Sequence, residues 1–108
     1  MEIITYNDFE KIEIKIGKII SAEKVLNSDK LIKLIFDIGA KKQQIIAGIS
    51  AFKNPSELIG KEMPILVNIK PRKFRGIYSY GMILTVDVNG EPILLHPEKE
   101  VPPGSIVR

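Results

Sequence analysis

One short segment in the middle of the chain reads Asn54-Pro55-Ser56-Glu57-Leu58-Ile59-Gly60. Asn54 is a favourable helix N-cap, because its side chain can accept a hydrogen bond from a free backbone N–H of the first turn. Pro55 suits the first helical position, and Glu57 stands three residues after the cap, as in a capping box. Gly60 suits the left-handed conformation that often follows a helix. The segment predicts a helix of one or two turns from about Pro55 to Ile59.

Strand patterns lie on both sides of this helix. The first begins at Ile12, alternates apolar and charged residues with the period of a half-buried strand, and continues to Val25. Gly17 interrupts it, which suggests a bulge or sharp bend. Strands are expected over 12–25, 31–38 and 43–49 before the helix, and over 62–70 and 81–88 after it. Asn89-Gly90 predicts a two-residue hairpin turn to 93–95, and 6–11 could form one helical turn capped by Asn7 or Asp8.

The order of these elements predicts an all-β fold. Three strands, a short helix and two strands match a five-stranded oligonucleotide/oligosaccharide-binding (OB) barrel, with the helix between strands 3 and 4 and a C-terminal β extension. A small SH3-like barrel is the main competitor, and the placement of the helix disfavours it. OB barrels bind ligands across strands two and three and the adjoining loops, but a fold alone does not give a function.

Length and composition limit the classes of protein to consider. The chain has 108 residues, which predicts a single domain over 1–108, and 44% of them are hydrophobic and 27% charged, as in ordinary globular proteins. The absence of Cys excludes disulfides, Cys-ligated zinc and thiol nucleophiles. No apolar run reaches the roughly 20 residues of a membrane span, and the N-terminus lacks the features of a signal peptide. We therefore expect no membrane association and a cytoplasmic location.

The sequence shows no pattern of catalytic residues. Ser79 is one residue out of register with a nucleophile elbow, and the single His, His96, is followed by Pro97. A lone His is more often a surface or packing residue than a catalyst. Carboxylates are scattered, and no Gly-rich loop precedes a helix. We expect a non-enzyme that needs no cofactor and no metal.

Positive charge is concentrated in one segment. The net charge is +3, and Lys70-Pro71-Arg72-Lys73-Phe74-Arg75, here called the basic segment, holds four basic residues and no acid. Without those four, 12 basic residues remain against 13 acidic ones, a net charge of −1. Concentrated basic charge around an aromatic residue is typical of phosphate contact. A solvated basic loop is the alternative that the pattern leaves open.

The residues around the basic segment carry a resemblance. Residues 68–82, with 8–17, Ser28-Asp29-Lys30-Leu31, Ile46-Ala47-Gly48-Ile49 and Val101-Pro102-Pro103-Gly104-Ser105, resemble the tRNA-binding domain found at the C-terminus of many methionyl-tRNA synthetases and in free-standing tRNA-binding proteins. The resemblance covers Asp8 to Arg108. The chain departs from it before Lys30, where many relatives have His-Pro and this sequence has Leu26-Asn27-Ser28.

The resemblance implies a set of RNA-binding residues. The expected set is Lys30, Asn68, Lys70, Arg72, Lys73, Arg75, Ser79 and Met82. The four cations of the basic segment would contact phosphates, and Lys30 would add to the same face. Asn68 would bond a base edge, unless its amide instead fixes the basic loop. Ser79 and Met82 would meet one exposed nucleotide if a bulge at Gly81 puts both side chains on one face, whereas Met82 could instead pack in the core.

The resemblance also implies partners. The chain would bind tRNA by shape, as an accessory (beta) subunit or a trans-acting domain of a methionyl-tRNA synthetase whose catalytic subunit does the aminoacylation. It would form a homodimer through the segment after the barrel, where Ile93-Leu94-Leu95, Val101, Ile106 and Val107 are more apolar than an exposed tail should be. The alternative is a chaperone-like or protein-interaction module with the same fold. A carbohydrate-binding barrel gains nothing from the basic segment.

Overall fold

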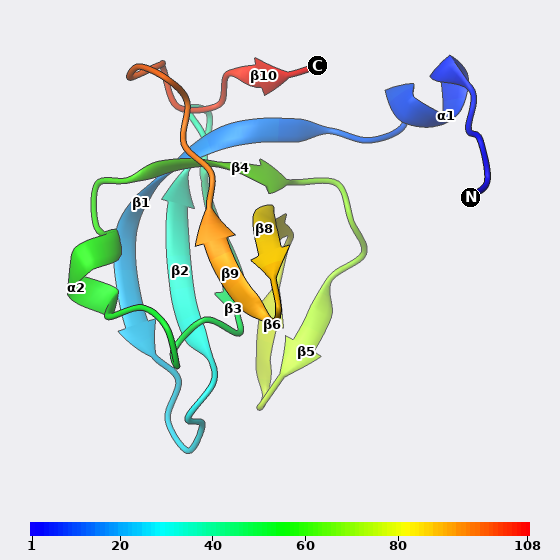
Figure 1. Ribbon diagram of the computed structural model, residues 1–108. Coiled ribbons are helices and arrows are strands. Elements are labelled where there is room, and N and C mark those ends of the chain that lie inside the picture. The colour runs from blue at the N-terminus through cyan, green and yellow to red at the C-terminus, as the bar shows by residue number, and fades with distance from the viewer.

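The computed structural model describes residues 1–108. A curved antiparallel sheet dominates it, with strand order β3-β2-β1-β4-β7, and it forms a nearly closed barrel (Figure 1). The strands in this order are β1 (Ile14–Lys24), β2 (Ile32–Asp37), β3 (Lys42–Ala47), β4 (Glu62–Leu66) and β7 (Met82–Ile83), and a sixth strand, β10 (Ile106–Val107), pairs with β1. The prediction of an all-β, OB-like barrel is confirmed. No helix in the chain has the length and apolar character needed to cross a bilayer.

The first strand bends, but not where its glycine suggests. Its register with β2 shifts between Ile19 and Ser21, so the bulge lies two to four residues after Gly17. Gly17 has a different role. A Cβ there would lie 2.7 Å from Cδ1 of Phe36 and 3.0 Å from Cδ1 of Ile65. Glycine at this position therefore lets the Phe36 ring pack directly against the strand.

The hydrophobic core lies inside the barrel and is formed by side chains of β2 and the neighbouring strands. Alternate residues of β2 are fully buried, and Ile32, Leu34 and Phe36 are each 0% exposed. Ile45 from β3 and Ile65 from β4 face them, also at 0%. This alternation is the pattern that the sequence shows over 31–38, and it places the polar residues of the strand on the outer face.

The predicted helix is present and covers one end of the sheet. It is α2 (Pro55–Leu58), and it lies beside β1 in Figure 1. Asn54 N donates to Glu57 Oε1 at 2.8 Å, one half of the expected capping box. Leu58 is 0% exposed and packs into the core, and Gly60 has a φ of +87°. The chain then returns into β4.

The segment after β4 differs from the sequence prediction. The fourth strand ends at Leu66 rather than at Lys70, and the basic segment is not a loop. It contains β5 (Arg72–Phe74), which pairs with β6 (Ile77–Ser79) as a separate hairpin. The strand expected over 81–88 is divided into β7 and β8 (Thr85–Val88), and β8 pairs with β9 (Glu91–Leu94). The turn predicted at Asn89-Gly90 joins these two strands, with φ values of 53° and 86°.

Both ends of the chain lie at one side of the barrel. The N-terminal arm, residues 1–13, contains α1 (Tyr6–Glu10) and projects away from the sheet (Figure 1). Its cap is Thr5, in a capping box with Asp8, rather than Asn7 or Asp8. The C-terminal β10 (Ile106–Val107) pairs with Ile14 and Lys15 of β1, which confirms the predicted β extension.

Candidate nucleic-acid interface

The basic hairpin, formed by β5 and β6, presents the charge in a fixed geometry. Arg75 and Gly76 form its two-residue turn with φ values of 50° and 83°. Positive φ at both central positions defines a type I′ turn, whose twist matches the flanking strands. Arg72 pairs with Ser79, Lys73 with Tyr78 and Phe74 with Ile77. The cations are therefore held on a twisted ribbon rather than spread along a flexible loop.

The basic side chains point into solvent and have no acidic partner. Lys70, Arg72, Lys73 and Arg75 are exposed, and none makes an ion pair within 4.0 Å. The Arg72 guanidinium lies 4.9 Å from the centre of the Phe74 ring, and Lys73 Nζ lies 5.6 Å from that of Tyr78. Such contacts orient a cation without neutralising it, because the ring carries no net charge. The hairpin thus offers unneutralised positive charge to an anion.

Lys30 lies in the neighbouring loop. It is exposed in the connection from β1 to β2, where Ser28 Oγ accepts from the backbone N–H groups of Lys30 at 3.3 Å and Leu31 at 3.2 Å. This loop and the turn of the basic hairpin point to the same end of the molecule in Figure 1. A hollow lined by Leu26 and Ile77, among others, lies between the two elements. The structure therefore brings Lys30 to the side of the barrel that carries the hairpin.

Asn68 has two bonds within the protein. Its Oδ1 accepts from Glu13 N at 2.9 Å, and its Nδ2 donates to the carbonyl oxygen of Lys11 at 2.6 Å. Val67 N also donates to the carbonyl oxygen of Glu13 at 3.0 Å. These bonds fix the base of the N-terminal arm to the end of β4, so Asn68 positions the arm rather than only the basic segment. One N–H of its exposed amide remains free for a ligand.

Ser79 does not reach the surface. It is 3% exposed, and its Oγ accepts from Ile46 N at 2.9 Å and donates to the carbonyl oxygen of Gly81 at 2.9 Å. The predicted arrangement, with Ser79 and Met82 on one exposed face, is wrong in this respect. Gly81 does change the direction of the chain, with a φ of +149°, but Ser79 points inward while Met82 is 43% exposed. That exposure also argues against core packing as the role of Met82.

Replacing Ser79 by alanine should therefore affect stability first. The change leaves the buried N–H of Ile46 without its side-chain acceptor, and an unsatisfied buried donor costs about 1–3 kcal/mol. We expect chemical denaturation to show a loss of that size, with tRNA affinity per folded molecule unchanged. A loss of tRNA affinity in a fully folded Ser79→Ala protein would instead show that the Ser79 hydroxyl contacts RNA.

Two glutamines that the sequence analysis did not single out close the barrel. Gln43 is 6% exposed, and its Nε2 donates to the carbonyl oxygens of Val67 and Tyr80. Gln44 Nε2 donates to the carbonyl oxygen of Tyr78 at 2.7 Å, and Tyr80 N donates to the carbonyl oxygen of Gln44 at 2.9 Å. In the sequence, the only signal for this role is that Gln43 is a polar residue at a core-facing position of the third expected strand.

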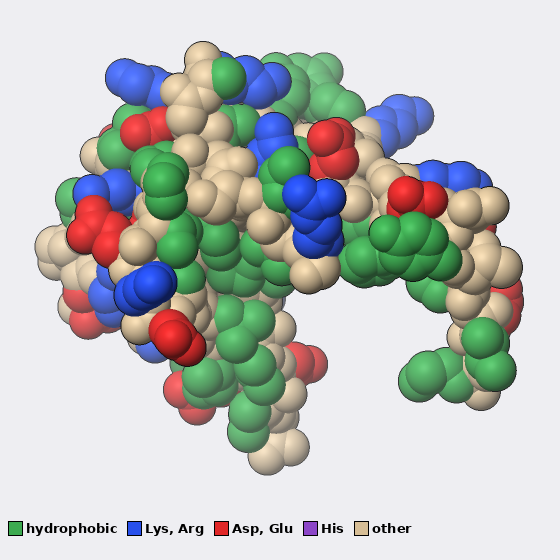
Figure 2. All heavy atoms as spheres, turned by 90° about the horizontal axis from the view of Figure 1, so that it is seen from above, with side chains coloured by type: hydrophobic (Ala, Val, Ile, Leu, Met, Phe, Trp, Pro, Cys, Tyr) green, Lys and Arg blue, Asp and Glu red, His purple; other side chains and the backbone are tan.

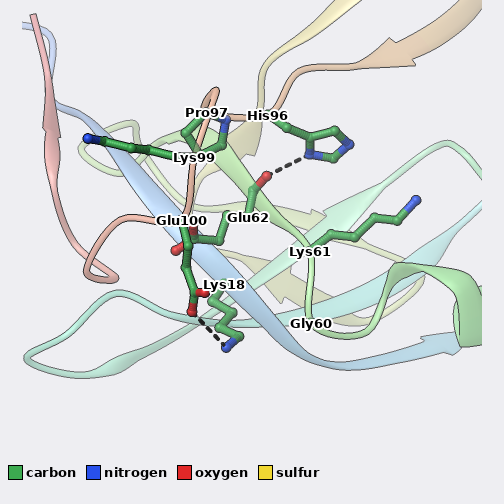
Figure 3. A pocket seen from close by; sticks show the side chains of 8 residues that line it. All are labelled: Lys18, Gly60, Lys61, Glu62, His96, Pro97, Lys99 and Glu100. Carbon is green, nitrogen blue, oxygen red and sulfur yellow. Dashed lines mark hydrogen bonds and ion pairs between the residues drawn. The ribbon is translucent and has the colours of Figure 1, made fainter.

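A second hollow lies away from the basic hairpin (Figure 3). His96 is here, and its Nδ1 donates to the carbonyl oxygen of Glu62 at 2.7 Å, so it pairs with backbone and not with a carboxylate or a serine. Lys18 forms an ion pair with Glu100 at 3.9 Å. Because carboxylates offset the lysines of this hollow, it carries less unneutralised charge than the hairpin. It contains none of the predicted RNA-binding residues.

Comparison with known proteins identifies the family of this chain. A family model described as "Putative tRNA binding domain" matches residues 14–106, nearly the whole chain. The chain belongs to this tRNA-binding domain family. The family resemblance drawn from the sequence is confirmed.

The relatives of this tRNA-binding domain include long enzymes. The chain is 51% identical to the methionine–tRNA ligase of Archaeoglobus fulgidus over 98% of its own length, and 44% identical to that of Thermotoga maritima over 96%. In both cases it spans 16% of the relative. The chain therefore corresponds to about one sixth of these ligases.

Solved structures of similar proteins match the whole domain. A MetRS-related protein from Pyrococcus horikoshii has a TM-score of 0.95 and 38% identity, with 100% of both chains covered. The chaperone CsaA of Bacillus anthracis has a TM-score of 0.88 and 29% identity, covering 99% of this chain and 100% of its own. The tRNA-binding domain thus resembles both a synthetase-related protein and a protein described as a chaperone.

Proposed function

We propose that this tRNA-binding domain binds tRNA on the side of the barrel formed by the basic hairpin and the β1–β2 loop. The observation that carries the proposal is the set of exposed, unpaired cations on a rigid hairpin, with Lys30 on the adjacent loop. Cations on a rigid ribbon can follow the phosphate backbone of a folded RNA and give affinity with little sequence preference. We propose Met82, which is 43% exposed, and the free N–H of the Asn68 amide as further contacts.

The finer role that we propose is an accessory (beta) subunit or trans-acting domain of methionyl-tRNA synthetase, in the cytoplasm. The similarity to one sixth of methionine–tRNA ligases supports it. The domain would hold the tRNA while the catalytic subunit aminoacylates it. Adding it to a synthetase catalytic subunit that lacks such a domain should lower the apparent KM for tRNA and leave kcat unchanged. An unchanged KM, with tRNA binding intact, would contradict the synthetase role alone.

The binding itself is tested by its salt dependence. Phosphate contacts release counterions, so the logarithm of the affinity should fall linearly with the logarithm of the salt concentration, with a slope of about −0.7 to −0.9 per contact. We expect a filter-binding titration with total tRNA from the same cells to show a slope that corresponds to several contacts. A slope near zero would contradict phosphate-driven binding.

We also propose a homodimer, in which apolar surface near both chain ends is covered by a second copy. Tyr6 is 71% exposed, Ile12 43% and Ile106 61%, and together they help to line a groove between the N-terminal arm and β10. Figure 2 shows apolar side chains on the projecting arm and on the protrusion across the open space from it. Of the residues expected at the interface, Ile93 is 40% exposed and Leu95 40%, whereas Leu94 packs against the core.

Light scattering should therefore give about twice the 12.1 kDa of one chain. Replacing Ile106 by aspartate places a charge in the apolar groove and should shift the equilibrium toward the monomer, because burying an unpaired charge is costly. Lys99→Ala, an exposed change outside the groove, serves as the control. A mass of one chain for the unaltered protein at working concentration would contradict the dimer.

A chaperone-like role is the second candidate, and the likeness to CsaA together with the exposed apolar groove favours it. The two roles can be separated by one pair of variants. A tRNA role depends on the basic hairpin, and a chaperone role depends on the apolar groove. Suppression of aggregation that Ile106→Asp abolishes and that changes in the hairpin leave intact would support the chaperone role.

A further inference from the structure

A hollow beside the basic hairpin is not used by the phosphate contacts proposed above. Residues from the start of β3, the β4–β5 connection and the segment between β6 and β7 line it, including Lys41, Lys42, Gln44, Ile69, Pro71 and Tyr80. We infer that this hollow takes one unpaired nucleotide of a bound RNA, with its base on the Tyr80 ring and its phosphate on Lys41 and Lys42. This inference rests on the proposed function and gives it a specificity for unpaired bases.

The backbone around Tyr80 is held on both sides. The buried Gln43 amide donates to the carbonyl oxygen of Tyr80 and, at 3.3 Å, to that of Val67. On the other side Tyr80 N donates to the carbonyl oxygen of Gln44 at 2.9 Å. These bonds form before any ligand arrives, so little conformational freedom is lost when one binds.

The Tyr80 ring extends from this fixed backbone into solvent. The residue is 46% exposed, and its ring centre lies 6.1 Å from that of Tyr78. Ile69 is 36% exposed and Pro71 is also exposed, so apolar surface borders the ring. A partly exposed aromatic ring on a fixed backbone can serve as a stacking platform, because every base offers a flat π surface to it.

The mouth of the hollow is positively charged. Lys41 and Lys42 are exposed, neither makes an ion pair within 4.0 Å, and no Asp or Glu lines the hollow. Uncompensated lysines in a concave, partly apolar setting attract an anion. The Gln44 amide uses one N–H on the carbonyl oxygen of Tyr78, which leaves its second N–H and its oxygen for the edge of a base.

The combination of groups favours a nucleotide over an acidic peptide. Both ligands would neutralise Lys41 and Lys42. Only the nucleotide carries a flat base next to its phosphate. The face of this base can stack on the exposed Tyr80 ring, and its edge can bond the free groups of the Gln44 amide. Because stacking inside a helix covers both faces of a base and pairing occupies its Watson–Crick edge, the nucleotide must be unpaired.

The test compares two RNAs with the same stem. One is a stem–loop that carries 2-aminopurine as an unpaired loop base, and the other is a blunt duplex. We expect the protein to change the 2-aminopurine emission. Tyr80→Leu should weaken binding of the stem–loop about tenfold without altering the salt slope, because this change removes stacking and no charge. Tyr80→Phe should behave as the unaltered protein, and binding of the duplex should not change.

The two lysines give an independent readout. Replacing both lysines together (Lys41→Ala with Lys42→Ala) should flatten the salt slope for the stem–loop by about 0.7, the value for one phosphate contact of a single strand, whereas Lys99→Ala should not. Thermal unfolding serves to check that Tyr80→Leu is folded. If the folded variant binds the stem–loop as tightly as the unaltered protein and gives the same 2-aminopurine emission, the inference is overturned and the proposed function stays intact. An acidic peptide whose binding depends on Tyr80, with RNA affinity unaffected, would also overturn it. If neither RNA binds while tRNA does, the inference alone is overturned, and if tRNA does not bind either, the proposed function fails together with the inference.

Discussion

Replacing both Arg72 and Lys73 by alanine should lower tRNA affinity at least tenfold. Each side chain is exposed on β5 without an acidic partner, so each can release counterions from a phosphate. The salt slope should flatten by about 0.7–0.9 for each phosphate contact that the change removes. Filter binding at several salt concentrations measures both effects in one experiment.

The fold should survive this double change. Both side chains lie in solvent, and each takes part in one cation–π interaction, Arg72 with Phe74 and Lys73 with Tyr78. Such an interaction is worth about 0.5–1 kcal/mol at an exposed site, so the fold depends little on either one.

The matched control is Lys61→Ala with Lys99→Ala, which removes the same charge from the hollow of Figure 3. If both double variants bind tRNA as the unaltered protein does, the basic hairpin is not the binding surface. If both lose affinity equally, net charge rather than the hairpin determines binding.

Gly81→Ala should cost about 2–4 kcal/mol of stability, from backbone strain and overpacking together. Gly81 has a φ of +149°, a region that side chains rarely adopt. A Cβ there would lie 2.6 Å from the carbonyl oxygen of Leu66 and 3.2 Å from the Gln43 amide. Because the first of these is backbone of β4, it cannot move without breaking the β4–β7 pairing.

A second glycine separates the two causes. Gly76 in the hairpin turn has a φ of +83°, but a Cβ there would meet nothing within 4 Å. Gly76→Ala therefore bears only the conformational cost and should lose roughly 1 kcal/mol. Denaturant unfolding of both variants gives the comparison. Equal losses would mean that the approach of Gly81 to Leu66 contributes nothing and that the barrel closes in another way.

The helix and the order of the barrel strands could be predicted from residues that lie close together in the sequence. The capping residues of 54–60 act within a few positions of one another, so their effect can be read without knowing the rest of the fold. The alternation over 31–38 likewise follows from one strand having one buried face. Asn89-Gly90 predicted its turn correctly because only a few residue types tolerate positive φ at both positions.

The details of the candidate site needed the tertiary structure. Arg75-Gly76 is also a local turn signal, but the charges around it favour a loop. The sequence therefore does not predict the hairpin of β5 and β6. Ser79 could not be assigned to the interior from its own neighbours, because its hydrogen-bond donor, Ile46 N, lies 33 residues away. The same holds for Asn68, whose partners Lys11 and Glu13 are 57 and 55 positions distant.

The sequence by itself determined the order of strands and helix, the side of each strand that is buried and the concentration of charge in residues 70–75, because all three depend on neighbours along the chain. Only the tertiary structure decided which polar side chains remain free for RNA. Gln43, Ser79 and Asn68 each satisfy a backbone group of a segment that is distant in the sequence. Buried backbone groups require partners, and the identity of those partners is set by how distant segments pack together and not by the local sequence.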